Sequence, residues 1–459
     1  MSSIPQNKKN ENEISDFVTK FMKEFQIGKL LFQCNAGKLK GIPVVDVFRY
    51  LFCLIFSDRS MYMQRKTGVC DAGFCKNTVY RFLNSTKTNW LRFTTLLSTR
   101  IINGFMKPLT DDTRKDVFII DDSLFDRSRS GKTELLAKVF DHCTMKYKRG
   151  FRMLTLGWSD GNSFIPVNHC LLSAADDKNL LCNAESFDGR SLAGKRRKQS
   201  RCKATEVMLD LIKTAQQSGL TAKYVLFDSW FTSPKSIVAL KQERKLDVIA
   251  MAKKSSKVKY AYQGELLDIK KIYSKNRKRR GRSKYLLSIE VTVGTEEIPA
   301  KIVCVRNKSK KKDWLAIIST DTSLSEEEII RVYGKRWDIE VFFKSCKSYL
   351  RLVKECRSLS YDALTAHVSI VFTRYMLLSV AQRRNEDEKT ICELFFCLAD
   401  ELDDITFSQS MRIIVDALMD AVMEYFHITE QQLEEFTASF VHRLPKYMQE
   451  ALLHGQKAA

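Results

Sequence analysis

Residues 331–350, RVYGKRWDIEVFFKSCKSYL, carry charged side chains in a segment that otherwise has the composition of a buried helix. At about 100° per residue, five polar side chains fall on one face of that helix. They are Tyr333, Arg336, Glu340, Lys344 and Lys347. Burying such groups without partners is costly, so we expect the stripe to face water, an ion or a ligand. A structural row of ion pairs at i, i+4 spacing is the alternative.

Two further acidic sites follow short apolar segments. The sequence FIIDDS ends such a segment in Asp121 and Asp122, and VLFDSWF ends another in Asp228. In open α/β sheets, ligands bind where the ends of neighbouring strands meet. Two aspartates there would repel each other unless a cation bridged them, and oxygen ligands favour Mg²⁺ or Mn²⁺. Taken singly, each aspartate is better explained as a turn or cap residue.

The helical stripe and the two strand ends together predict a site for a metal and phosphates. Glu340 would complete the metal shell that Asp121 and Asp228 begin. The basic members of the stripe, Arg336, Lys344 and Lys347, would bind an anionic backbone.

The charge balance of the whole chain points to the same class of partner. The 459 residues have a formal net charge of +22, although their 44% hydrophobic and 28% charged content is ordinary for a soluble protein. Such an excess favours a polyanion, with nucleic acid as the first candidate and an anionic membrane surface as the second. The length suffices for two to four domains with a sizeable core.

Several other classes of protein are disfavoured. Charged residues interrupt the apolar runs near 44–57 and 366–381, so neither provides the ~18 uncharged residues of a membrane span. The polar N-terminus lacks a signal-peptide core, so we expect a cytosolic protein. The thirteen cysteines contain no CxxC pair and no histidine at zinc-finger spacing. They are predicted to be free and mostly buried thiols.

The N-terminal region, residues 1–112, has the apolar rhythm of helices. Within it, Asn77-Thr78 precede an amphipathic helix that contains Val79 and Phe82. This helix resembles the second helix of a helix-turn-helix, with Tyr80 and Arg81 able to face DNA. An ordinary helical hairpin is the alternative. This region is predicted to bind DNA because the chain is strongly basic.

The central region, residues 113–358, alternates strands and helices, and the tail, 359–459, is again helical. Asp160-Gly161 predicts a hairpin turn, and GKRRKQSRCK at 194–203 is interpreted as a basic loop. Residues 246–320 are rich in strand patterns, and Ser325 with Glu328 forms a capping-box pattern before the charged helix. We therefore expect an α/β fold with helical regions at both ends.

The pattern Tyr-x2-Arg-x3-Glu-x6-Lys, met by Tyr333, Arg336, Glu340 and Lys347, resembles the signature of bacterial insertion-sequence transposases of the IS-four family. The segments FIIDDS and VLFDSWF are also similar to that family, and the resemblance spans roughly residues 115–350. It implies an RNase H-like core with a β-rich insertion before the last catalytic helix.

The resemblance also implies catalytic residues. The Asp-Asp-Glu metal triad would be Asp121, Asp228 and Glu340, with Asp122 as the alternate first acid. Asp121 is preferred because the family pattern has Thr or Ser two residues after the first Asp, and Ser123 stands there.

A tryptophan in this family stacks on an unpaired base, and Trp314 occupies its place. Trp230 and Trp337 are predicted to pack inside the protein. The other DNA-binding candidates are Tyr333, Arg336, Lys344, Lys347 and Arg81.

The implied activity is cut-and-paste DNA transposition. Two Mg²⁺ or Mn²⁺ ions would support hydrolysis at the element's ends and transesterification into target DNA. The implied partners are double-stranded DNA, as terminal inverted repeats and target, and a second copy of the chain in the DNA complex. The implied location is the bacterial cytosol, with the nucleoid. A non-catalytic DNA-binding descendant and an RNase H-like Mg²⁺-dependent nuclease are the alternatives.

Overall fold

The computed structural model describes residues 17–38, 40–56, 61, 73–110, 114–141, 144–276, 285–307, 313–384, 432 and 439. The chain divides into two compact units, one of residues 1–55 with 60–394 and the other of 56–59 with 395–459. The elements below belong to the first unit. The acidic patch near 398–404 and the predicted helices beyond 384 lie outside the described residues.

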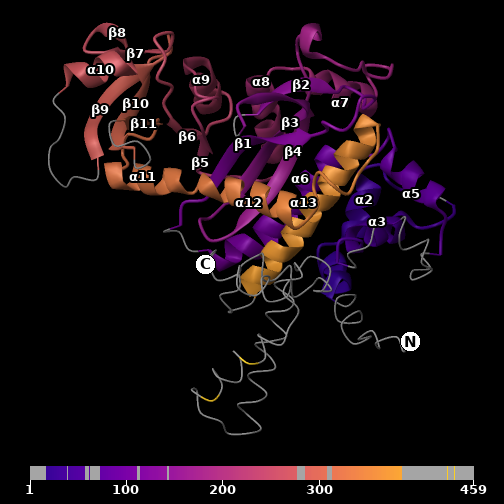
Figure 1. The fold of residues 1–459 in the computed structure, drawn as a ribbon. Helices are drawn as coiled ribbons and strands as arrows, with labels where there is room; N and C mark the ends of the chain where they lie inside the picture. Colours follow the sequence, from indigo (N-terminus) through magenta and orange to yellow (C-terminus); the bar gives the residue numbers. More distant parts are fainter. Residues whose placement is uncertain are drawn as a thin grey trace. The chain divides into compact units, whose positions relative to one another are not determined.

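One mixed sheet of eleven strands organises the described residues (Figure 1). Strand β5 pairs in parallel with β1 and β6, and the other pairings are antiparallel. The order is β2-β3-β1-β5-β6-β11-β10-β9-β7-β8, with β4 beside β3. The strands are β1 (Val117–Asp126), β2 (Ala137–Asp141), β3 (Lys146–Ser159), β4 (Phe164–Leu172), β5 (Tyr224–Phe227), β6 (Asp247–Met251), β7 (Lys259–Tyr262), β8 (Glu265–Asp268), β9 (Tyr285–Val293), β10 (Ile298–Arg306) and β11 (Trp314–Ser319). The predicted α/β class is confirmed.

Helices from several parts of the chain flank this sheet. In the N-terminal part they are α2 (Ile27–Gln33), α3 (Val44–Cys53), α5 (Lys76–Leu83) and α6 (Trp90–Ile101), followed by the short π and 3-10 turns η1 (Ile102–Met106) and η2 (Lys107–Leu109). Further on come η3 (Asp177–Asn179), α7 (Leu192–Ser200), α8 (Ala204–Gln217), α9 (Pro234–Gln242), α10 (Ile269–Lys275), α11 (Glu326–Gly334), α12 (Trp337–Ser348) and α13 (Tyr361–Arg384). The described part of the N-terminal region is thus helical, as its apolar rhythm predicts.

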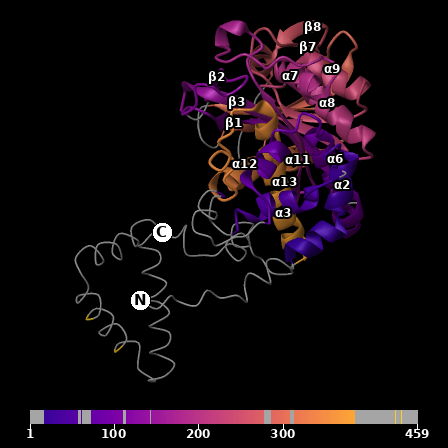
Figure 2. The same cartoon turned by 90° about the vertical axis from the view of Figure 1, so that its right-hand side faces the viewer.

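Two adjacent residues of β4 show which helices cover which face of the sheet. His169 packs its ring on Phe372 of α13, with centroids 4.8 Å apart. Its neighbour Asn168 donates to the Leu211 carbonyl of α8 at 3.1 Å. Successive strand residues point to opposite faces, so α13 and α8 lie on opposite sides of the sheet. Helix α3 packs against α13, and α2 packs against α3; Figure 2 shows these three helices near one another.

The predicted continuous helix over 331–350 is wrong. Helix α11 ends at Gly334 and α12 begins at Trp337, with Lys335 and Arg336 between them. Figure 1 shows the two helices following one another almost in line. The predicted capping box is confirmed, because Ser325 and Glu328 each accept from the other's backbone N–H.

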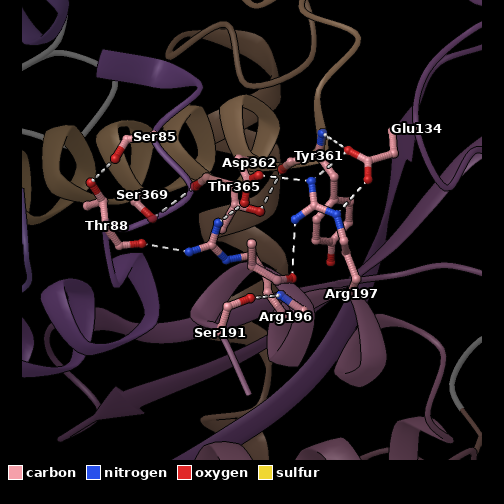
Figure 3. A network of polar contacts seen from close by, with 12 residues as sticks. Ser85, Thr88, Glu134, Ser191, Arg196, Arg197, Tyr361, Asp362, Thr365 and Ser369 are labelled. Carbon is pink, nitrogen blue, oxygen red and sulfur yellow. Dashed lines mark hydrogen bonds and ion pairs between the residues drawn. The ribbon is translucent and has the colours of Figure 1, made fainter. Parts of the chain in front are cut away.

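The predicted basic loop at 194–203 is also wrong, because 192–200 form helix α7. Ser191 begins that helix by accepting from the Gly194 N–H at 3.0 Å. The guanidinium of Arg197 is buried between Glu134 and Asp362, as Figure 3 shows. Arg196 and Arg197 therefore have internal partners, which permits one side of the segment to pack as a helix.

The strands predicted within 246–320 are confirmed, but they do not form a separate sheet. Strand β6 pairs in parallel with β5 and antiparallel with β11, which joins β10, β9 and β7 to the core. The three-part division at residues 112 and 358 stays a prediction.

One helix among the described residues, α13, is long and apolar enough to cross a membrane, and its apolar window is entirely buried. That burial is typical of a core helix. The nine cysteines that the structure describes are free, and five of them are buried.

Candidate active site

The pairing of β1 with β5 brings the two predicted aspartates to one edge of the sheet. Ile119 lies opposite Leu226 in the parallel register, so Asp121 and Asp228 follow at the same level, two residues further along. The turn after β5 fixes Asp228. Its carboxylate accepts from the Trp230 N–H at 2.9 Å, and its carbonyl accepts from the Thr232 hydroxyl at 2.9 Å.

Arg336, in the break between α11 and α12, brings the third carboxylate to this edge. Its Nη1 lies 3.3 Å from Asp121 Oδ2, and its Nη2 lies 2.5 Å from Glu340 Oε1. One guanidinium therefore bridges the first and third acids of the predicted triad. Asp228 follows its strand at the same edge, and the metal-binding role of the three acids stays a prediction.

Asp121 carries the electrostatic strain of this arrangement. Burial raises its pKa to about 7, helped by the negative charges of Asp122 and Asp228, while Arg336 acts in the opposite direction. A buried carboxylate beside two others requires a proton or a cation to neutralise it.

The structure separates the two candidates for the first acid. Asp122 forms an ion pair with Arg152, which lies on the neighbouring strand β3. Asp121, on the other face of β1, contacts Arg336. The geometry therefore favours Asp121 over Asp122, and its catalytic role stays a proposal.

The remaining residues of the polar pattern have different surroundings. Lys347 donates to Ser123 Oγ at 2.5 Å, on the same face of β1 as Asp121. The hydroxyl of Tyr333 is buried near the Arg336 guanidinium, and burial raises its pKa to about 12, while Arg336 acts in the opposite direction. Lys344 is exposed.

Helix α12 also has an exposed apolar side. Trp337 is 61% exposed and Val341 is 56% exposed, so the prediction that Trp337 packs inside is wrong. Together with exposed Lys344, these residues follow one another at i, i+4 and i+7. One face of this helix is therefore open to solvent beside the carboxylates.

The tryptophans near the site also differ from expectation. Trp314 stacks on Tyr273, with centroids 4.1 Å apart, and Lys254 lies 4.2 Å from its centroid. Trp230, predicted to be packed, is 49% exposed, with Arg152 5.0 Å and Lys253 5.5 Å from its ring centroid.

An exposed indole flanked by cations suits a nucleobase next to phosphates. The only signal for it in the sequence is its place two residues after Asp228. Trp314 has its ring engaged within the protein, so its predicted role in base stacking has no support from this geometry.

Helix α5 exposes the two residues that are predicted to face DNA. Tyr80 is 49% exposed and Arg81 is exposed, while Val79 and Phe82 are buried. Arg81 Nε donates to the Asn77 carbonyl at 3.3 Å. The segments 57–60 and 62–72 before this helix lie outside the described residues, so the helix-turn-helix stays a prediction.

The donor chemistry of the site fits a hard divalent cation. Asp121, Asp228 and Glu340 offer only oxygen ligands, and burial together with the neighbouring carboxylates raises the pKa of Asp121. Within the described residues, no three His, Cys, Asp or Glu side chains stand close enough to hold a metal as they lie. In this structure Arg336, which lies between Asp121 and Glu340, supplies the positive charge that these two carboxylates contact.

Carboxylates gathered at a sheet edge beside arginine and lysine are typical of enzymes that process phosphate esters with divalent metals. A family model described as DDE superfamily endonuclease matches residues 54–314, more than half of the chain, and the chain belongs to this family. No curated protein matches it.

Family membership implies an RNase H-like core and supports a nuclease- or transposase-type function on DNA with divalent-metal dependence, which is general in this superfamily. The matched segment includes Asp121 and Asp228 and ends before Glu340.

Proposed function

We propose that the protein is a DDE transposase of the insertion-sequence type, which cuts the ends of a DNA element and joins them to target DNA. The observation that carries this proposal is the bridge from Asp121 through Arg336 to Glu340, at the edge where Asp228 also ends its strand. An i, i+4 ion pair of Arg336 with Glu340 needs no further carboxylate, yet the same guanidinium also contacts Asp121, whose pKa is raised by burial and by Asp122 and Asp228.

Each residue has a role in this mechanism. Asp121, Asp228 and Glu340 would hold two Mg²⁺ or Mn²⁺ ions. When bound, the ions supply an activated water and neutralise charge on the leaving 3′ oxygen. Arg336, released from its carboxylates, would bind a phosphate bidentately, and Lys347 would hold a neighbouring one.

The partners follow from the same mechanism. The substrate is double-stranded DNA, as the element's terminal repeats and as target, and a pair of chains would act on the two ends. A nuclease of the same core would share every step up to strand cleavage. The proposal differs from it in the final transesterification by the freed 3′-OH.

The test of the catalytic assignment is Glu340→Gln. We expect Mg²⁺-dependent cleavage of an end-containing duplex to fall by at least about 10²-fold, because a ligand carboxylate is lost. Binding of the same duplex, measured in EDTA, should remain. Glu243→Gln, the same change at a 60% exposed side chain beyond α9, is the control and should cleave normally. Wild-type cleavage rates in Glu340→Gln would refute the assignment.

A strand-transfer assay separates transposase from nuclease. Pre-cleaved ends with free 3′-OH groups are incubated with supercoiled plasmid, wild-type protein and Mg²⁺. We expect joined products from the wild type and none from Glu340→Gln. A wild-type protein that cleaves ends but never joins pre-cleaved ones would be a nuclease.

A further inference from the structure

The β2–β3 hairpin carries more positive charge than its own residues neutralise. Residues 137–150 contain four basic side chains and one acidic side chain. That acid, Asp141, is paired with Lys148 at 2.8 Å and accepts from the Thr144 hydroxyl at 2.7 Å. Among the described residues, no carboxylate pairs with the other three, Lys138, Lys146 and Arg149.

Two of these cations stand side by side with two aromatic rings. In the β2–β3 register Lys138 lies opposite Arg149, and Phe140 lies opposite Tyr147. Directly opposed residues share a face of the sheet, so these four form one surface, which we call the basic hairpin face. Phe140 and Tyr147 pack edge to face, with centroids 5.3 Å apart.

The opposed cations of the basic hairpin face lower the stability of the strand pair unless an anion neutralises them. Opposed like charges destabilise a strand pair. Lys138 and Arg149 are exposed, and Tyr147 is 69% exposed. An alternative explanation is that Lys138, on the edge strand β2, prevents this edge from pairing with another strand. That explanation does not extend to Arg149 and Tyr147, which lie on the inner strand β3.

Strand register places this face relative to the carboxylates. Asp121 lies opposite Thr155 on β3, and Arg149 is six residues from Thr155 on that strand. An even separation keeps both on one side of the sheet, and six residues span about 20 Å. Since DNA rises about 3.4 Å per base pair, this span corresponds to roughly six base pairs.

We propose that the basic hairpin face binds the phosphodiester backbone of double-stranded DNA, roughly six base pairs from the bond that is cut. Lys138 and Arg149 pair with phosphates, and the Tyr147 hydroxyl donates to a phosphate oxygen. The position relative to the cut rests on the proposed function, whereas the contact with DNA rests on the charge and exposure of the hairpin alone.

The test removes both opposed charges in the full-length protein, as Lys138→Gln with Arg149→Gln. Binding to a random-sequence duplex of several helical turns is measured in EDTA at increasing salt. Two lost phosphate contacts should reduce the slope of log K against log salt by about 1.8. The melting temperature should hold or rise, because the variant relieves a repulsion.

The matched control is Lys203→Gln with Lys213→Gln, which removes two exposed charges at α8, on the opposite side of the sheet. Its slope should stay at the wild-type value. A hairpin variant with the wild-type slope overturns the proposal, and so does a control with an equal loss.

A hydroxyl-radical footprint on an end-containing duplex tests the position. The hairpin variant should lose protection roughly six base pairs from the cut and keep it elsewhere, and an unchanged footprint overturns the proposed position. These readings are independent of catalysis. If the slope falls but the wild type never cleaves, the DNA-binding surface stands and the proposed function fails. If the wild type cleaves and the slope is unchanged, the hairpin proposal alone fails.

Discussion

At Asp121 the protein holds a carboxylate in conditions that favour its neutral form. The side chain is only 18% exposed, and it lies near the charges of Asp122 and Asp228. Arg336 offsets part of this repulsion through a contact of 3.3 Å. The neighbouring carboxylates therefore lower the folding stability of the protein, and they also provide oxygen ligands for a cation.

The raised pKa of Asp121 predicts how stability depends on pH without metal. The folded-state pKa of Asp121, about 7, is above the ordinary value of 3.8, so the folded protein binds the extra proton between these values. Stability should therefore fall as pH rises from about 4 to about 7 and then level off. Asp121→Asn removes the titrating group and should be more stable than wild type at pH 8 by about 2–4 kcal/mol. Urea unfolding in EDTA measures the difference.

Two controls sharpen this comparison. The difference between wild type and Asp121→Asn should shrink towards pH 4, where both side chains are neutral. Added Mg²⁺ should raise the melting temperature of the wild type more than that of the variant, because a bound cation stabilises the folded state. A variant that is less stable than wild type at pH 8 in EDTA would contradict the assigned strain.

At the scale of elements, the break between α11 and α12 aims Arg336 at the carboxylates. Lys335 donates to the carbonyls of Lys115 at 2.6 Å and Asp160 at 2.9 Å, which fastens the break to the start of β1 and to the β3–β4 turn. On the other side of Arg336, Asp338 accepts from Ser159 at 2.6 Å. The β3–β4 turn packs closely against Lys335, since a Cβ at Gly161 would lie 2.8 Å from Lys335 Cε.

The sequence predicts those parts of the site that local patterns determine. Asp121 and Asp228 end apolar runs, and Asp160-Gly161 is a strong turn signal, so local patterns alone predict the structural place of each. The helix break has only a weak local signal, Gly334, at which α11 ends. The position of Arg336 depends on the carbonyls that Lys335 reaches across more than 170 residues. The pattern at 194–203 predicts a basic loop for the same reason, since Glu134 and Asp362, which pair with Arg197, lie far away in the sequence.

Lys335→Met tests the role of the break. It removes the ammonium that binds both carbonyls and keeps most of the side chain's apolar volume. We expect cleavage to fall by about 10²-fold, because a small displacement of Arg336 and Glu340 disturbs the reacting geometry. DNA affinity in EDTA should change little. Separate measurement of kcat and KM should assign the loss to kcat.

Lys354→Met provides the matched control, because this lysine is exposed in the segment after α12. It should cleave DNA at the wild-type rate. Should Lys335→Met lose affinity while its kcat is kept, Lys335 would be a DNA contact instead of a positioning residue. The melting temperature of Lys335→Met tests whether partial unfolding causes its loss of cleavage.

At the scale of the whole first unit, a buried ionic network joins four distant parts of the chain (Figure 3). Arg197 of α7 contacts Glu134, between β1 and β2, at 2.6 Å and Asp362 of α13 at 2.9 Å. Arg196 pairs with the same Asp362 and donates to the Thr88 carbonyl, just before α6, at 2.6 Å. The network thus links the helices of the N-terminal region to the sheet that holds the carboxylates.

Removing Arg197 should therefore destabilise the unit more than loss of an ordinary ion pair. Arg197→Met leaves Glu134 and Asp362, which are 5% and 2% exposed, short of their counter-charge. Breaking a buried pair on one side costs about 3–5 kcal/mol. Arg190→Met, at a 93% exposed side chain paired with Asp188, should cost at most about 1 kcal/mol. Urea unfolding of both variants measures the contrast. Equal losses of unfolding free energy would show that the contacts of Arg197 in Figure 3 do not stabilise the unit. Another interaction would then fix the N-terminal helices to the sheet.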